Sequence, residues 1–97
     1  MPNPADLVTI LAGHLAELQE HAVTGLWLFG SAARGELCPE SDIDLLVAFD
    51  RPVSLFEFAR LRRRLQELLG RPVDLVTRDA LKPQLRERIL REAVRAA

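Results

Sequence analysis

The sequence has few of the features that mark secreted, membrane-spanning or nucleic-acid-coating proteins. Its one cysteine, Cys38, excludes an internal disulfide framework and fits a reducing cytoplasm. The first residues do not combine a basic stretch with a following apolar one, so no signal peptide is expected. No apolar run approaches the roughly 18 residues that a membrane span needs. The net charge of −1 predicts neither broad nucleic-acid binding nor membrane binding.

Repeats, low-complexity tracts and linkers are also lacking, and 97 residues can build one modest core but not two. We therefore expect a single domain over residues 1–97. Charge is uneven along it: five acids and no base lie between Glu36 and Asp50, whereas Arg51–Arg71 holds six arginines and two glutamates. The second stretch predicts a helix whose arginines are either a solvated face or a partner-facing surface. They include Arg60, Arg62, Arg63 and Arg64.

Hydrophobic spacing predicts an α/β (α+β) fold, a small mixed β-sheet with helices packed on it in the order α-β-β-α-β-α. The helix after the second strand has the clearest ends, because Ser54 and Glu57 form a capping-box pattern and Gly70 suits the position after the last turn. The expected elements are a helix from Pro4 or Asp6 to about His21, a strand at Leu26–Phe29, a helical turn at Ser31–Arg34, a strand at Ile43–Phe49, a helix from Ser54 to about Leu69, a strand at Pro72–Thr77 and a helix at Lys82–Arg95.

The stretch GSAARGELCPESDIDLL, residues 30–46, carries the chemistry. A Gly-Ser turn that follows an apolar strand offers backbone N–H groups and a hydroxyl to an anion such as a triphosphate. Asp42 and Asp44 stand two residues apart at the start of the second strand, so they point to one face. Two carboxylates on one face repel each other unless a divalent cation lies between them. The stretch therefore predicts a site for a metal–nucleotide complex.

Asp74 is a third candidate, because it stands inside Pro-Val-Asp-Leu-Val, where a strand interior normally carries an apolar residue. If the third strand lies beside the second, Asp74 joins the other two aspartates in one acidic cluster. Two Mg²⁺ ions would neutralise such a cluster and clamp the attacking and leaving oxygens of a phosphoryl transfer.

Gly30-Ser31, ten intervening residues and then Asp42-Ile43-Asp44 resemble the signature of the DNA polymerase β-like nucleotidyltransferase superfamily. The wider stretch is similar to the minimal nucleotidyltransferase branch, whose members are about this short. The resemblance runs from the first expected strand to the third, and it implies the polymerase β-like nucleotidyltransferase fold.

The resemblance also implies roles for the site residues. Asp42 and Asp44 would be ligands of both Mg²⁺ ions. Asp74 would complete the shell of the catalytic ion and help to deprotonate the incoming hydroxyl. Gly30 and Ser31 would hold the β- and γ-phosphates of a nucleoside triphosphate, with ATP the expected substrate. An acceptor hydroxyl would attack the α-phosphate, and pyrophosphate would leave.

Two other residues are weaker candidates for nucleotide binding. Arg34 lies one turn after Ser31 and is read either as a phosphate ligand or as an ordinary surface arginine. Ser41 stands immediately before Asp42 and is read either as a triphosphate contact or as a hydrogen bond that orients the aspartate.

The resemblance implies a partner as well, since minimal nucleotidyltransferases often pair with a HEPN-domain ribonuclease toxin. There the nucleotidyltransferase is the antitoxin, in some cases by adenylylating the toxin, and such a short chain is expected to form a hetero- or homo-oligomer. Two alternatives stay open. One is a catalytically silent antitoxin that acts by binding alone, and the other is a small-molecule nucleotidyltransferase of the aminoglycoside-modifying type.

Overall fold

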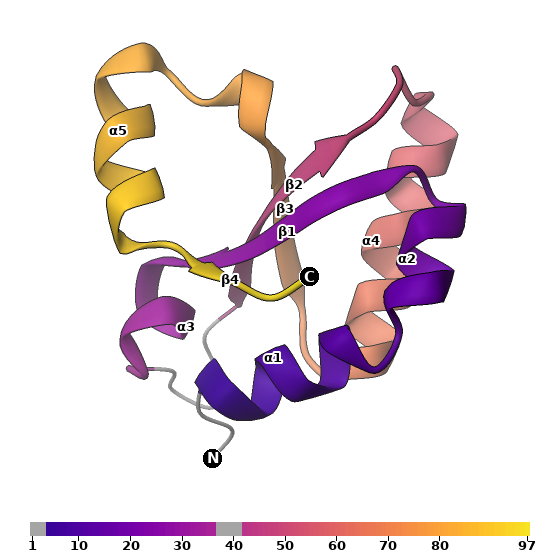
Figure 1. The fold of residues 1–97 in the computed structure, drawn as a ribbon, viewed down its shortest axis with the longest axis horizontal. Coiled ribbons are helices and arrows are strands. Elements are labelled where there is room, and N and C mark those ends of the chain that lie inside the picture. Colours follow the sequence, from indigo (N-terminus) through magenta and orange to yellow (C-terminus); the bar gives the residue numbers. More distant parts are fainter. Residues whose placement is uncertain (1–3, 37–41) are drawn as a thin grey trace.

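The structure is a computed structural model that describes residues 4–36 and 42–97 (Figure 1). Its elements are the helices α1 Pro4–Ala12 and α2 Leu15–Glu20, the strand β1 Val23–Phe29, the short helix α3 Gly30–Arg34, the strand β2 Ile43–Phe49, the helix α4 Leu55–Leu69, the strand β3 Val73–Thr77, the 3₁₀ turn η1 Arg78–Ala80, the helix α5 Pro83–Glu92 and the strand β4 Val94–Arg95.

The strands form one mixed sheet in the order β3-β2-β1-β4. β1 pairs antiparallel with both β2 and β4, whereas β2 and β3 are parallel. A parallel pair needs a crossover between its strands, and α4 supplies it. The expected mixed sheet with packed helices is therefore confirmed.

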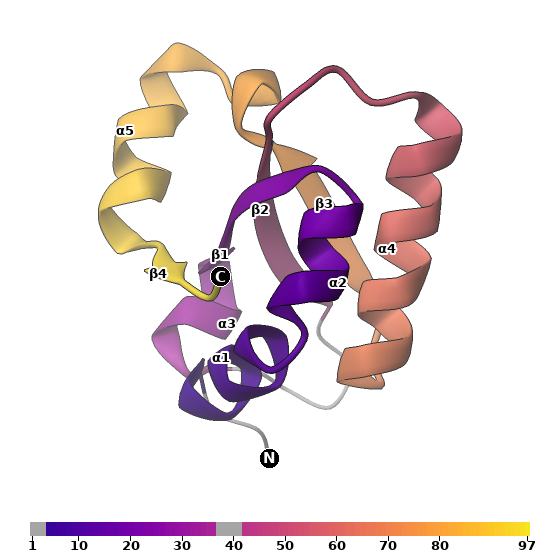
Figure 2. The ribbon, with the colours of Figure 1, turned by 45° about the vertical axis from the view of Figure 1, so that its right-hand side comes forward.

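The two faces of the sheet differ in character because side chains alternate along each strand. Leu26 and Leu28 of β1, with Leu45 and Val47 of β2, point into the main core, which α1, α2 and α4 cover. The other face carries Trp27, Phe29, Asp44, Leu46 and Asp74. α5 lies on that side of the sheet, opposite α4 (Figures 1 and 2). Within the ranges that the structure describes, no helix has both the length and the apolar character needed to cross a bilayer.

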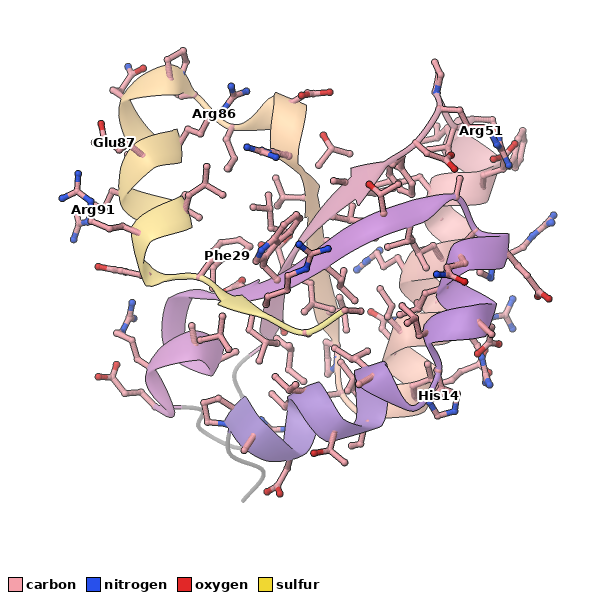
Figure 3. All side chains as sticks on the ribbon, in the orientation of Figure 1. His14, Phe29, Arg51, Arg86, Glu87 and Arg91 are labelled. Atoms are coloured by element: carbon pink, nitrogen blue, oxygen red, sulfur yellow. The ribbon has the colours of Figure 1, made fainter. Side chains whose placement is uncertain are left out.

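The prediction of one N-terminal helix to His21 was wrong, because the helix breaks at Gly13 into α1 and α2 (Figure 3). Gly13 has little helix propensity. The His14 ring bonds back to the Ile10 carbonyl at 2.8 Å, and the His14 N–H donates to Leu11 O rather than continuing the helical ladder.

The C-terminal prediction was also wrong, since the last helix ends at Glu92 and Val94–Arg95 form β4 instead of a further turn. Trp27 and Leu28 of β1 pair with β4, and the Arg95 guanidinium lies 5.2 Å from the centre of the Trp27 ring. β1 starts at Val23 rather than at Leu26, because Val23 pairs with the end of β2.

The middle of the chain follows the prediction closely. β2 spans Ile43–Phe49 as expected, and α4 ends at Leu69 with Gly70 in the left-handed conformation. Ser54 caps α4, and its hydroxyl accepts a bond from the Glu57 N–H at 3.1 Å. The Glu57 side chain accepts from Arg51 at 3.2 Å, so the cap works through the serine.

We expect Ser54→Ala to lower the free energy of unfolding by about 1 kcal/mol, because it removes the acceptor for a helix N–H. Urea unfolding followed by circular dichroism measures the change. Ser54→Asp keeps an acceptor and should stay close to wild type, and an equal loss in both variants would contradict the capping role.

Candidate functional site

The site begins with two aspartates on neighbouring strands. Asp44 of β2 and Asp74 of β3 are direct partners in the parallel register. Paired residues on adjacent strands lie about 4.8 Å apart and point to the same face. The expectation that the third strand lies beside the second is therefore confirmed, and so is the meeting of these two carboxyl groups on one face.

Asp42 lies immediately before β2 and is exposed, as is Asp74, whereas Asp44 is partly buried. The pKa of the Asp44 carboxyl is raised above its ordinary value, first by burial and then by the negative charges of Asp74 and Asp42, against a smaller opposing effect of Arg34. Each of these charges acts on the same carboxyl group. The three aspartates thus form one electrostatic cluster.

Gly30 lies next to Asp44, on the β1 side of the three aspartates. Phe29, the last residue of β1, pairs with Asp44, so α3 starts directly beside this aspartate. Figure 3 shows Phe29 on the side of the sheet that faces α5. Gly30 has a φ of +62°, and a Cβ placed on it would lie 2.5 Å from Asp44 Oδ2. Glycine is required here both by the backbone conformation and by the close approach of the carboxylate.

Three candidates remain. Ser31 is the second residue of α3 and is partly buried. Arg34 is about half exposed, and its guanidinium makes ion pairs with Glu36 at 3.0 Å and with Glu92 at 3.7 Å. Sequence reasoning did not single out either glutamate, and Glu92 gave no signal because it belongs to a distant helix. Ser41 lies outside the described residues.

One hollow in the described part of the structure lies away from the aspartates. This hollow has a volume of about 690 Å³, and it lies at the far end of β2, around Phe49, Asp50 and Arg78. Asp44 stands five residues earlier on the same strand, so this hollow is separate from the cluster.

Among residues 4–36 and 42–97, no three His, Cys, Asp or Glu side chains are grouped tightly enough to hold a metal ion by themselves. The donor chemistry of the cluster nevertheless fits Mg²⁺, because all its ligand atoms are carboxylate oxygens. Magnesium usually takes one or two carboxylates and completes its shell with water and substrate phosphates. A phosphate-bearing substrate beside Gly30 would supply the missing oxygens.

The structure thus has a mixed sheet with paired aspartates on one face, next to a Gly-Ser turn, and this arrangement is consistent with a nucleotidyltransferase. The family of nucleotidyltransferase domains matches the sequence over residues 9–96. The chain belongs to this family and, within it, to the minimal nucleotidyltransferases.

Known relatives cover nearly the whole chain. The protein adenylyltransferase MntA of Thermococcus cleftensis is 41% identical over 90 residues, which are 92% of this chain and 91% of the relative. A solved structure described as a candidate minimal nucleotidyltransferase superposes with a TM-score of 0.83 at 41% identity, covering 96% and 95% of the two chains. A complex of a tri-AMPylated HEPN toxin from Shewanella oneidensis with its MNT antitoxin has a chain with the same fold, at a TM-score of 0.67 and 18% identity, covering 94% of this chain and 71% of that one.

Gly30→Ala should abolish Mg-ATP binding and lower the stability by more than the roughly 1 kcal/mol that the left-handed backbone costs an alanine. The added Cβ must displace the Asp44 carboxylate. Gly35→Ala is the matched control, since Gly35 has a φ of +71° and, among the described residues, its Cβ would meet only Pro4, at 3.6 Å. Calorimetry with Mg-ATP separates the two, and equal binding by both variants would refute the close-approach role of Gly30.

Asp44→Asn should raise the melting temperature at pH 7 in the presence of EDTA. The pKa of Asp44 is higher in the folded state than its ordinary value of 3.8, so the folded state binds the proton more tightly. Stability is therefore lost as the pH rises from 3.8 through the folded pKa, and the asparagine variant escapes this loss. The increase in melting temperature over wild type should become smaller toward pH 4. An asparagine variant that melts below wild type at pH 7 would contradict the raised pKa of Asp44. Asp50→Asn, at the other end of β2, is the control.

Proposed function

We propose that this chain is a magnesium-dependent protein adenylyltransferase that transfers AMP from ATP to a hydroxyl group of a HEPN-domain partner. The transfer would make the chain the antitoxin of that partner, and the reducing cytoplasm is the compartment we propose for the pair. The adjacency of Asp44 and Asp74, with Gly30 against Asp44, is the observation on which the proposal chiefly rests.

The proposed role of each residue follows from its position on the sheet. Gly30 and Ser31, at the β1 side, would receive the β- and γ-phosphates of ATP. Asp42 and Asp44, in the middle, would orient the α-phosphate through the shared cations. Asp74, on the edge strand β3, would accept or position the proton of the incoming hydroxyl. The acceptor oxygen then bonds to the α-phosphorus, the bond to the bridging oxygen breaks, and pyrophosphate leaves.

Two Mg²⁺ ions, when bound, would neutralise the charge that develops on the phosphoryl oxygens. Asp42, Asp44 and Asp74 are the residues that would hold them. The pKa of Asp44 is raised first by burial and then by the charges of Asp74 and Asp42, and a bound cation would offset both effects.

Arg34 and Ser41 would assist with the nucleotide. The Arg34 guanidinium is close enough to influence the Asp44 carboxyl, which places a positive charge near the expected triphosphate. To bind phosphate it would exchange one of its two carboxylate partners. Ser41 would contact the triphosphate or orient Asp42.

The identity of the acceptor is inferred from relatives. The Thermococcus relative at 41% identity is named as a protein adenylyltransferase, and the Shewanella toxin is described as AMPylated in complex with an antitoxin of the same fold. Both support a protein hydroxyl, rather than a small molecule, as the acceptor.

The proposal predicts transfer of labelled AMP from ATP to the HEPN-domain protein of the same genome, in the presence of Mg²⁺. Asp42→Asn and Asp74→Asn should each reduce transfer by at least about a hundredfold, as the loss of an essential charged group does. Mass spectrometry of the partner gives the site and extent of modification. Asp50→Asn should transfer normally, and wild-type protein that binds Mg-ATP but never labels the partner would count decisively against the proposal.

A further inference from the structure

The first turn of α4 exposes two consecutive large apolar side chains. Leu55 and Phe56 are each 82% exposed, whereas the next most exposed large apolar residues of the described ranges, Leu15 and Leu85, stand at 44% and 46%. Adjacent apolar groups left in water on a well-capped helix mark an interaction site more often than chance exposure. The hollow at the end of β2 reaches Pro52 and Val53, just before this turn.

The four arginines of α4 fall into two classes. Arg62 Nε donates to the Val73 carbonyl at 2.9 Å, and Arg64 Nε donates to Glu17 at 2.7 Å, so these two attach α4 to β3 and α2. Arg63 has a side chain that is 83% exposed, and its pairing with Glu67 is long, at 3.9 Å. Arg60 is exposed and makes no ion pair among the described residues.

The two available arginines lie on the same stripe as Phe56. Positions 56, 60 and 63 follow the i, i+4, i+7 spacing of one helix face, and the buried Leu61 and Leu65 point the other way, into the core. Figure 2 shows this outer side of α4 at the margin of the molecule, with no other helix or strand beyond it. The stripe thus presents apolar surface first and positive charge one to two turns later.

We propose that Leu55, Phe56, Arg60 and Arg63, the α4 surface, dock an acidic amphipathic helix of the protein partner. This inference rests on the proposed function only for the identity of the partner, a HEPN-domain protein. An apolar side chain of that helix meets the Leu55–Phe56 pair, and its carboxylates meet the two guanidinium groups. Aromatic and arginine side chains are the residues that protein interfaces favour.

A second copy of this chain would bind the α4 surface less favourably than an acidic partner, because of its charge. Two α4 surfaces brought together would gather four guanidinium groups in one interface, and like charges there cost several kcal/mol. An acidic partner instead pairs each guanidinium and gains electrostatic steering during association.

The α4 surface and the aspartates lie on opposite sides of the sheet. Docking therefore leaves the nucleotide site open, and the modified hydroxyl comes from a segment of the partner other than the docked helix. Binding of the partner and transfer of AMP are separable properties of this chain.

The test is calorimetric titration of the full chain with the HEPN-domain protein of the same genome. Leu55→Ser/Phe56→Ser should weaken binding by at least about tenfold. Arg60→Glu/Arg63→Glu should weaken it similarly, and wild-type affinity should fall as the salt is raised from about 50 to about 300 mM. Mg-ATP binding should be unchanged in both double variants, which also shows that they fold.

Arg88→Glu and Leu85→Ser are the matched controls on α5, since both residues are exposed there, and they should bind the partner as wild type does. Wild-type affinity in Leu55→Ser/Phe56→Ser would overturn the inference. So would a wild-type dimer, seen by light scattering, that the same double variant dissociates, because the surface would then belong to a second copy. If wild-type protein binds the partner through this surface but transfers no AMP, the proposed function fails and the docking surface stands.

Discussion

The placement of Asp44 beside Asp74 is the constraint around which this small domain is arranged. Burial is the first cause of the raised pKa of Asp44, and the parallel register adds the negative charge of Asp74 on the same face. Hydrogen bonds from α4 hold β3 in this register at Val73, the residue before Asp74. The Val73 N–H donates to Gln66 at 3.1 Å, and its carbonyl accepts from Arg62 at 2.9 Å. The crossover helix thus fixes the edge strand in the position that the chemistry requires.

The same constraint explains the abrupt start of α3. Because Phe29 pairs with Asp44, the chain turns away from the sheet directly after β1. Only glycine fits at this turn, since a Cβ on any other residue would meet the Asp44 carboxylate. The Gly-Ser turn and Asp44 are therefore adjacent as a result of strand pairing, although they are not neighbours in the chain.

Local sequence patterns predicted the bounds of a helix or strand correctly where the residues of that element alone determine them. The bounds of β2 and the Ser54 and Gly70 ends of α4 followed from short-range capping and alternation. The break at Gly13 was missed because a continuous apolar stripe concealed it, and β4 was missed because two residues form a strand only when β1 is beside them. In the site, residue types and faces were predictable. The pairing of Asp44 with Asp74 depends on register between strands separated by α4, and no local pattern contains that information.

The sheet also separates two kinds of chemistry. One face carries the partly buried Asp44 and the exposed Asp74, and the other face packs on the core beneath α4. A helix docked on the outer side of α4, as we propose, would be separated from the aspartates by the core and the sheet. Substitutions on the outer side of α4 would then change partner recognition without disturbing the geometry of the aspartates. In a domain of this size, the proposed placement of recognition and catalysis on opposite faces would let each vary independently.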